Sequence, residues 1–208
     1  MIIVSDFDGT LTLDDVTTFV WDKHLGYDWR AQLLPPTYDG RWTPLEMIAR
    51  GYADIRVPPK ELLAEIRPNV RLRPGVEALA TFCRGRGWHF GVVSHGLSFY
   101  IEALLPAWIP FTAFVGTFKE WSWRVALPTT MAALLPGEDF KSRVVADLRA
   151  RHPGHETIYL GDGRLDLPAA LTCERIFAVA GSSLAELARA AGREVQEFDS
   201  LDEVAASL

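Results

Sequence analysis

Two aspartates one residue apart, Asp6 and Asp8, directly follow the apolar residues near the start of the chain. The β-branched, uncharged run before them predicts a short buried strand over residues 2–5. Side chains at positions i and i+2 point to the same face of a strand, and open α/β sheets bind ligands at the carboxyl ends of their strands. Because two adjacent carboxylates repel each other, the pair predicts a bound cation, and oxygen donors favour Mg2+.

The next two residues, Gly9 and Thr10, complete this first motif. Glycine frees the backbone to turn away from the strand, and threonine offers a hydroxyl and an amide. We expect both to lie in the substrate-binding loop. An Asp-rich turn after an edge strand is the alternative interpretation, since Asp and Gly dominate turns; the rest of the chain separates the two.

A second motif, Gly91-Val-Val-Ser-His-Gly96, contains a hydroxyl at the end of a strand predicted over residues 89–93. A hydroxyl and free amides at such a position can bind a phosphate oxygen. We therefore expect Ser94 to contact a phosphoryl group, with His95 and Gly96 beside the substrate. Serine is also common at strand ends and helix caps, so this motif alone is weak.

A lysine and a third acidic motif follow further along the chain. Lys141 begins a predicted helix, where a lysine is ordinarily solvated, but near aspartates and a phosphate it can neutralise charge. Asp162 follows the apolar residues 157–160 between two glycines, and Asp166 lies four residues later. We expect Asp162 to join the metal site, with Asp166 close by on the first turn of a helix.

The chain alternates between predicted strands and helices. The strands cover residues 2–5, 89–93, 113–118, 157–160 and 175–179, and the helices cover 76–86, 97–104, 141–151, 166–172 and 183–191. Residues 119–127 contain alternating Trp and Val and predict one arm of an antiparallel hairpin. Strand–helix alternation is typical of an α/β fold with a parallel sheet covered by helices on both faces.

Residues 13–72 interrupt this alternation directly after the first strand. Helical patterns occur at 16–25, 44–54 and 59–67, with proline-rich turns at 34–37 and 57–60. An ordinary crossover is the alternative, but roughly sixty residues is long for one connection. We therefore predict a helical cap over residues 13–72, inserted into a catalytic core formed by residues 1–12 and 73–208.

Composition limits the classes of function. The chain has 208 residues, 49% of them apolar, and a formal net charge of -6. These values indicate a globular protein and disfavour nucleic acid as a partner, which usually requires a basic stripe. We expect no membrane association, since no apolar run could span a bilayer, and a cytoplasmic location, since the start lacks a signal-peptide pattern. The oligomeric state stays open, with a homodimer as the common default.

The ordered set of Asp6, Asp8, Ser94, Lys141 and the pair Asp162 and Asp166 resembles the motifs of the haloacid dehalogenase superfamily of phosphohydrolases. The resemblance implies a Rossmann-like sheet with a helical cap. It implies that Asp6 is the nucleophile and Asp8 the general acid and base, and that Ser94 and Lys141 hold the phosphoryl group. Mg2+ would bind to Asp6, Asp162 and the backbone carbonyl of Asp8, supported by Asp166. Halide-cleaving members lack the second aspartate, so Asp8 indicates phosphate chemistry.

Within the superfamily the chain looks like the phosphoserine phosphatase branch, and most like the phosphatases of methionine salvage that act on 2-hydroxy-3-keto-5-methylthiopentenyl-1-phosphate. Asp15 falls where phosphoserine phosphatases carry a substrate-contacting acid, and Arg50 near their carboxylate-binding arginine. Two departures weaken an assignment to phosphoserine: Gly9 replaces the usual serine, and His95 replaces a common glycine. The tryptophans and leucines of the cap favour a partly apolar substrate, or simply form a cap core.

Three alternative functions share these residues. A phosphotransferase would pass the phosphoryl group to an alcohol instead of water. A response-regulator receiver domain also uses an aspartate, a hydroxyl and a lysine, but its aspartate ends a middle strand, whereas Asp6 ends the first. An inactive binding module is disfavoured because every motif residue is present. We therefore predict a Mg2+-dependent hydrolase of a small phosphorylated metabolite.

Overall fold

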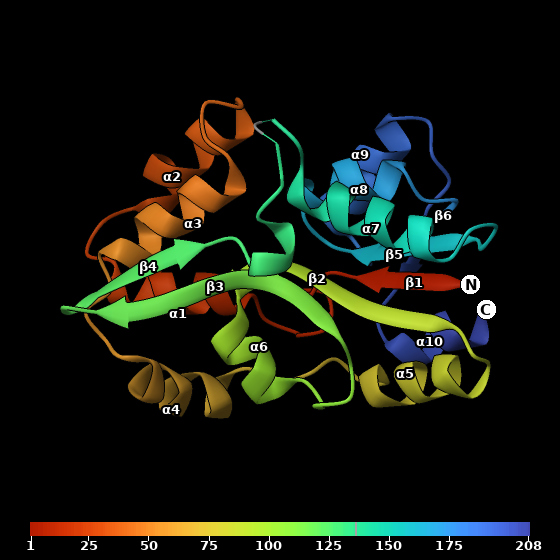
Figure 1. Cartoon of the computed structure of the whole chain (residues 1–208), viewed down its shortest axis with the longest axis horizontal. Coiled ribbons are helices and arrows are strands. Elements are labelled where there is room, and N and C mark those ends of the chain that lie inside the picture. Colours follow the sequence, from red (N-terminus) through yellow and green to blue (C-terminus); the bar gives the residue numbers. More distant parts are fainter. Residues whose placement is uncertain (136) are drawn as a thin grey trace.

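A parallel sheet forms the centre of the molecule. The computed structural model describes residues 1–135 and 137–208, and over these residues the strands form one seven-stranded sheet of order β4-β3-β2-β1-β5-β6-β7 (Figure 1). Neighbouring strands are parallel except β3 and β4. The strands are β1 (Ile2–Ser5), β2 (His89–Leu97), β3 (Phe111–Lys119), β4 (Ser122–Ala126), β5 (Thr157–Gly161), β6 (Arg175–Val179) and β7 (Gln196–Phe198).

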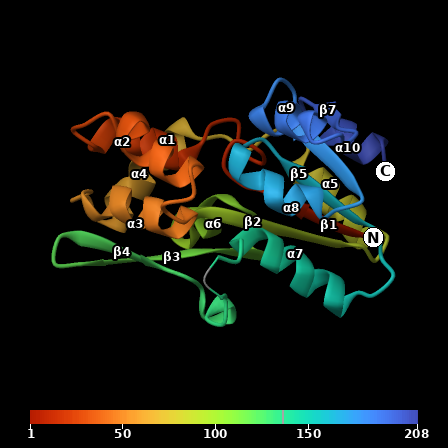
Figure 2. The same ribbon diagram turned by 90° about the horizontal axis from the view of Figure 1, so that it is seen from above.

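Helices cover both faces of this sheet, which confirms the predicted α/β class. One face carries α5 (Val76–Gly85), α6 (Ser98–Leu104) and α10 (Leu201–Ala206), and the other carries α7 (Phe140–Arg151), α8 (Leu167–Leu171) and α9 (Ser183–Ala190) (Figures 1 and 2). Every residue of β1 and β5 is buried. Such strands are largely apolar because helices exclude water from both of their faces.

The helices α1 (Val16–His24), α2 (Trp29–Tyr38), α3 (Pro44–Ala53) and α4 (Pro59–Asn69) form an insert after β1. They lie beyond the carboxyl ends of the parallel strands, at the opposite end from the N-terminus (Figure 2). The segments that enter and leave the insert are joined by antiparallel hydrogen bonds: the amide of Leu13 donates to the carbonyl of Arg71 (2.9 Å), and that of Arg73 to Leu11 (2.7 Å). The domain boundaries at 13–72 stay a prediction.

The largest error in the sequence-based prediction is α2, which replaces the turn expected at 34–37. Pro35 and Pro36 lie inside this helix. Asp28 caps its start by accepting a hydrogen bond from the amide of Ala31 (3.1 Å), and Pro36 is buried against the rest of the insert. Packing of this face therefore outweighs the helix-breaking tendency of proline, a local preference that tertiary contacts can override.

Two smaller differences concern the strands. The second strand does not end at residue 93: β2 continues to Leu97 through an irregularity in its pairing with β3 after Ser94. Bulges of this kind re-aim side chains next to functional sites. The short β7 and α10 were not predicted. A strand of three residues and a helix of six are too short to show a clear periodic pattern.

The hairpin of β3 and β4, whose antiparallel arm is confirmed, fastens the insert to the sheet. The hydroxyl of Ser122 donates to the carbonyl of Ala53 (3.0 Å), and the indole N–H of Trp123 donates to the carbonyl of Val57 (2.9 Å). Trp123 also packs edge-on against Tyr52, with ring centroids 5.9 Å apart. The connection between α3 and α4 is thereby held to the core.

None of the helices within residues 1–135 and 137–208 is long and apolar enough to cross a membrane.

Gly51 permits α1 and α3 to approach closely, and this contact gives a test of the insert's packing. A Cβ atom at Gly51 would lie 2.3 Å from the buried ring of Trp21. We expect Gly51→Ala to lower the free energy of unfolding by about 1–3 kcal/mol, the usual range for overpacking. Chemical denaturation checks this, with Gly85→Ala as control because no atom lies within 4 Å of its added Cβ. Equal stability of the two variants would contradict the packing interpretation.

Candidate active site

The loop after β1 is tightly hydrogen-bonded and holds its two aspartates in place. The amides of Leu11 and Thr12 both donate to the carbonyl of Phe7 (2.9 and 3.1 Å). The amide of Asp6 donates to the carbonyl of Leu160 in β5 (2.8 Å), so this residue still belongs to the sheet ladder. Asp6 and Asp8 are both buried. Their positions at the carboxyl end of β1 agree with the sequence prediction.

Lys141 lies between two of the carboxylates. Its Nζ atom is 2.5 Å from Oδ1 of Asp6 and 2.7 Å from Oδ1 of Asp166, and the side chain is buried. Burial disfavours the ammonium, but the negative charges of Asp166 and Asp6 raise the pKa of Lys141 above its ordinary value. Buried charges require such partners. α7 therefore supplies a permanent positive charge to the end of the sheet.

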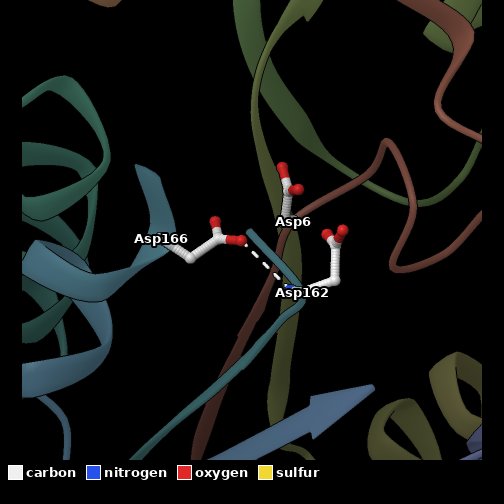
Figure 3. A group of neighbouring side chains, drawn as sticks. All are labelled: Asp6, Asp162 and Asp166. Atoms are coloured by element: carbon white, nitrogen blue, oxygen red, sulfur yellow. Dashed lines mark hydrogen bonds between the residues drawn. The ribbon is translucent and has the colours of Figure 1, made fainter. Parts of the chain in front are cut away.

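Asp166 is anchored by protein donors on both of its oxygens. Oδ1 accepts from the hydroxyl of Tyr159 (2.7 Å) as well as from Lys141. Oδ2 accepts from the amides of Asp162 (3.1 Å) and Gly163 (2.9 Å); the first of these bonds is drawn in Figure 3. With these four donors, Asp166 fits a supporting role better than that of a direct metal ligand.

An acidic cluster at the ends of β1 and β5 has the composition of a divalent cation site. Asp6, Asp162 and Asp166 each place one carboxylate oxygen within 4.8 Å of the others (Figure 3). The hydroxyl of Thr10 donates to Oδ1 of Asp162 (2.8 Å). Burial and the charge of Asp166 raise the pKa of Asp162 to about 7. Hard carboxylate oxygens suit Mg2+, which would relieve this crowding of negative charge.

Asp8 is held by three donors of its own. Oδ1 accepts from the amide of Val16 (3.1 Å), and Oδ2 accepts from the hydroxyls of Ser94 (3.1 Å) and Tyr100 (2.8 Å). Burial, followed by the charge of Asp15, raises the pKa of Asp8 to about 7. A carboxyl group with a pKa near neutrality can exchange a proton.

A cavity of about 320 Å3 opens beside these groups. The core side of its lining carries Asp6, Asp8, Ser94, Lys141 and Asp162, and the insert contributes mainly apolar side chains: Trp21, Trp29, Leu34, Met47 and Ile48. Trp21 and Trp29 meet edge to face, with centroids 5.0 Å apart. The chemistry and the apolar wall thus come from different parts of the chain.

The residues predicted to contact substrate divide into two groups. Asp15, His95 and Gly96 line the cavity. His95 is packed between Phe114 and Phe140, at centroid distances of 5.4 and 5.8 Å. Burial, and then the charge of Lys141, lowers the pKa of His95 well below its ordinary value, so the ring is neutral.

Gly9, Thr10 and Arg50 are not among the described residues that line the cavity. Both instead lie against the carboxylate of Asp162: the Thr10 hydroxyl donates to it, and Gly9 approaches it too closely for a side chain. The guanidinium of Arg50 lies 4.2 Å from the ring centroid of Trp42, on the exposed face of α3.

Three residues that sequence reasoning missed also contribute to the site: Tyr100 and Tyr159 bind the carboxylates, and Arg164 lines the cavity. Both tyrosines lie in apolar segments, where they read as ordinary core residues. Arg164 stands inside the Gly-Asp-Gly-Arg-Leu-Asp motif, and its basic charge among acidic residues was the available signal. Its guanidinium lies 5.2 Å from the ring centroid of Tyr38 in α2.

Gly9 provides a test of the acidic cluster. Its φ is +79°, and a Cβ atom there would lie 2.5 Å from Oδ2 of Asp162. Gly40 has nearly the same φ, +78°, but nothing lies within 4 Å of its added Cβ. We expect Gly9→Ala to weaken Mg2+ binding by roughly tenfold, a loss typical of a displaced ligand support, while Gly40→Ala leaves it unchanged. Calorimetric titration with Mg2+ measures this; equal affinities in the two variants would contradict the proposed geometry.

Comparisons with known proteins identify relatives in sequence and in fold. The chain is 23% identical over 224 residues to the polyol phosphate phosphatase PYP1 of Saccharomyces cerevisiae, covering 100% of this chain and 92% of that protein. It is 23% identical over 218 residues to the Pdp3-interacting factor 1 of Schizosaccharomyces pombe, covering 97% and 92%.

Among solved structures, a phospho-aspartyl intermediate analogue of phosphoserine phosphatase superposes with a TM-score of 0.76 at 16% identity, covering 100% of this chain and 98% of that chain. A substrate-bound phosphoserine phosphatase complex gives a TM-score of 0.74 at 15% identity, covering 100% and 97%. At these identities the superpositions show a shared fold. The family model described as haloacid dehalogenase-like hydrolase matches residues 3–171. The chain therefore belongs to the haloacid dehalogenase-like hydrolase family.

Proposed function

We propose that this chain is a Mg2+-dependent phosphomonoester hydrolase that works through an aspartyl-phosphate on Asp6. The observation that carries the proposal is the buried ion pair of Lys141 with Asp6 and Asp166. Asp8 has no part in this ion pair and accepts hydrogen bonds from other donors, such as Tyr100. Lys141 favours the ionised form of Asp6, which is the form that can act as a nucleophile. Asp8, with its raised pKa, would exchange the proton. The phosphatase relatives and structural neighbours support the same reaction class.

The residues account for both steps of hydrolysis. Lys141 engages Oδ1 of Asp6, and Oδ2 attacks phosphorus in line. The bond from phosphorus to the ester oxygen breaks, and Asp8 gives its proton to the departing alkoxide. Asp8 then takes a proton from water as the water oxygen attacks phosphorus, which releases phosphate and restores Asp6.

The remaining groups bind and position the phosphoryl group. Ser94 and Lys141, which line the cavity, would hold the phosphoryl oxygens. Mg2+, held by Asp6, Asp162 and the carbonyl of Asp8, would offset charge on the phosphoryl oxygens.

The cavity favours a small phosphomonoester with a partly apolar tail. Burial of apolar groups against Trp21, Trp29 and Met47 would supply the binding energy beyond the phosphate. The methionine-salvage enol phosphate has such a tail and is our first candidate. Phosphoserine is disfavoured, because the arginine expected to bind its carboxylate, Arg50, stacks outside the cavity on Trp42. The polyol phosphate phosphatase named above makes polyol phosphates a further member of the test panel.

Asp6→Asn tests the nucleophile. We expect turnover to fall by roughly 10^4-fold or more, the scale of nucleophile removal in other covalent enzymes, while the circular dichroism spectrum stays unchanged. The assay is phosphate release with Mg2+ from the methionine-salvage enol phosphate, polyol phosphates and phosphoserine. Asp147→Asn, which changes a surface pair with Arg143, is the control and should keep native turnover.

Two outcomes of the same assay bear on the mechanism. Retained turnover in Asp6→Asn removes this residue from the chemistry. Reaction in 18O-labelled water distinguishes a hydrolase, which places the label in phosphate, from a phosphotransferase, which places the phosphoryl group on an added alcohol.

Arg164 gives a test of substrate charge. Two cationic side chains, Lys141 and Arg164, are among the described residues that line the cavity. Lys141 is paired with two carboxylates, so Arg164 is the one that could bind a second anionic group of a substrate. We expect Arg164→Ala to raise KM for phosphoserine by roughly fivefold, corresponding to about 1 kcal/mol for an exposed pair, and to leave KM for neutral substrates unchanged. Arg50→Ala is the matched control, since it also removes an arginine stacked on an aromatic ring. Equal KM changes for acidic and neutral substrates would exclude this role.

A further inference from the structure

Arg73 is a buried arginine that binds the loop after β1, residues 6–12, here called the nucleophile loop. Its Nε atom donates to the carbonyl of Thr10 (2.7 Å), and Nη2 donates to the carbonyl of Gly9 (2.8 Å). Nη1 donates to the carbonyl of Asp199, in the connection between β7 and α10 (3.0 Å). One planar guanidinium therefore joins two segments that lie far apart in the sequence.

The partners of this guanidinium are backbone carbonyls. Among the described residues, no carboxylate oxygen lies within 4.0 Å of it. Burial lowers the pKa of Arg73, and the more distant charges of Asp162 and Asp199 oppose this shift. A buried charge without an ion pair is unfavourable unless its hydrogen bonds are well made. The rigid fork of arginine suits several fixed acceptors, a geometry that lysine lacks.

The two loop carbonyls bound by Arg73 belong to the residues that contact Asp162. Gly9 leaves room for the Asp162 carboxylate, and the Thr10 hydroxyl donates to it (2.8 Å). We propose that Arg73 is a positioning residue: by fixing the carbonyls of Gly9 and Thr10, it holds Asp162 in the orientation that binds the cation. The proposal rests on the metal site of the proposed function.

The position of Arg73 in the chain extends this role to two other segments. It is the residue at which the insert returns to the core, and its own amide donates to the carbonyl of Leu11 (2.7 Å). The segment after β7 docks beside it, since the amide of Leu201 donates to the carbonyl of Pro74 (2.8 Å). Asp199 lies beyond residues 3–171, which the family model matches. A part of the chain outside that match thus supports the nucleophile loop.

The experiment compares two arginines that bind carbonyls in the same way. Arg193 donates to the carbonyls of Leu171 (2.8 Å), Cys173 (2.5 Å) and Glu174 (3.2 Å), and none of these residues belongs to the site described above. Calorimetric titration of the metal-free full chain with Mg2+ is carried out for Arg73→Lys, Arg73→Met and the same two substitutions at Arg193. We expect both Arg73 variants to lose on the order of tenfold in Mg2+ affinity, and both Arg193 variants to keep native affinity.

Thermal melting establishes that each variant is folded. If Arg73→Met does not fold, Arg73→Lys, which keeps the charge and loses the fork, decides the question. Native Mg2+ affinity in a folded Arg73 variant overturns the proposal, as does absence of Mg2+ binding by the native chain. On any substrate that the native chain hydrolyses, we expect kcat to fall at subsaturating Mg2+ with KM nearly unchanged. If it hydrolyses none, the phosphatase proposal fails, while the calorimetry still decides the role of Arg73.

Discussion

The ammonium of Lys141, buried between the carboxylates of Asp6 and Asp166, is the interaction on which the rest of the site depends. Parallel pairing of β1 with β5 brings acidic side chains to one edge of the sheet, where their mutual repulsion and burial both oppose ionisation. The permanent cation of Lys141 in α7 offsets part of this concentration of negative charge. A bound Mg2+ would offset more of the negative charge of these carboxylates, so Lys141 and the metal would act on the same cluster.

The carboxylates of the site differ in function because different donors hold them. Asp166 receives four donors and is fixed as an anchor. Asp8 is bound by donors of its own, from Val16, Ser94 and Tyr100, and its pKa near 7 suits proton exchange. In the proposed mechanism, Asp6 and Asp162 would bind the cation. Identical side chains thus acquire separate roles from the elements that surround them.

Sequence reasoning predicted that Asp6 and Asp162 lie near each other, because parallel strands have their carboxyl ends on one side of the sheet, and the structure brings their carboxylates within 4.8 Å. Their roles stay a prediction. Arg50 and Arg73 show where such reasoning stops: both are arginines of or beside the insert, but one stacks on Trp42 and the other binds the carbonyl of Thr10. That difference arises from tertiary packing, which no local pattern records. The same holds for α2, whose prolines predicted a turn.

The division between core and insert also explains how substrate choice can vary while the chemistry is kept. Every proposed reacting side chain comes from the sheet, its loops or α7, whereas the apolar wall comes from α1, α2 and α3. Trp21 packs where Gly51 has no side chain, and Trp123 binds the insert to the β3–β4 hairpin. The wall is therefore held at two contacts, and a change of residue along it would alter the shape of the cavity while Asp6 and Lys141 stay on the core.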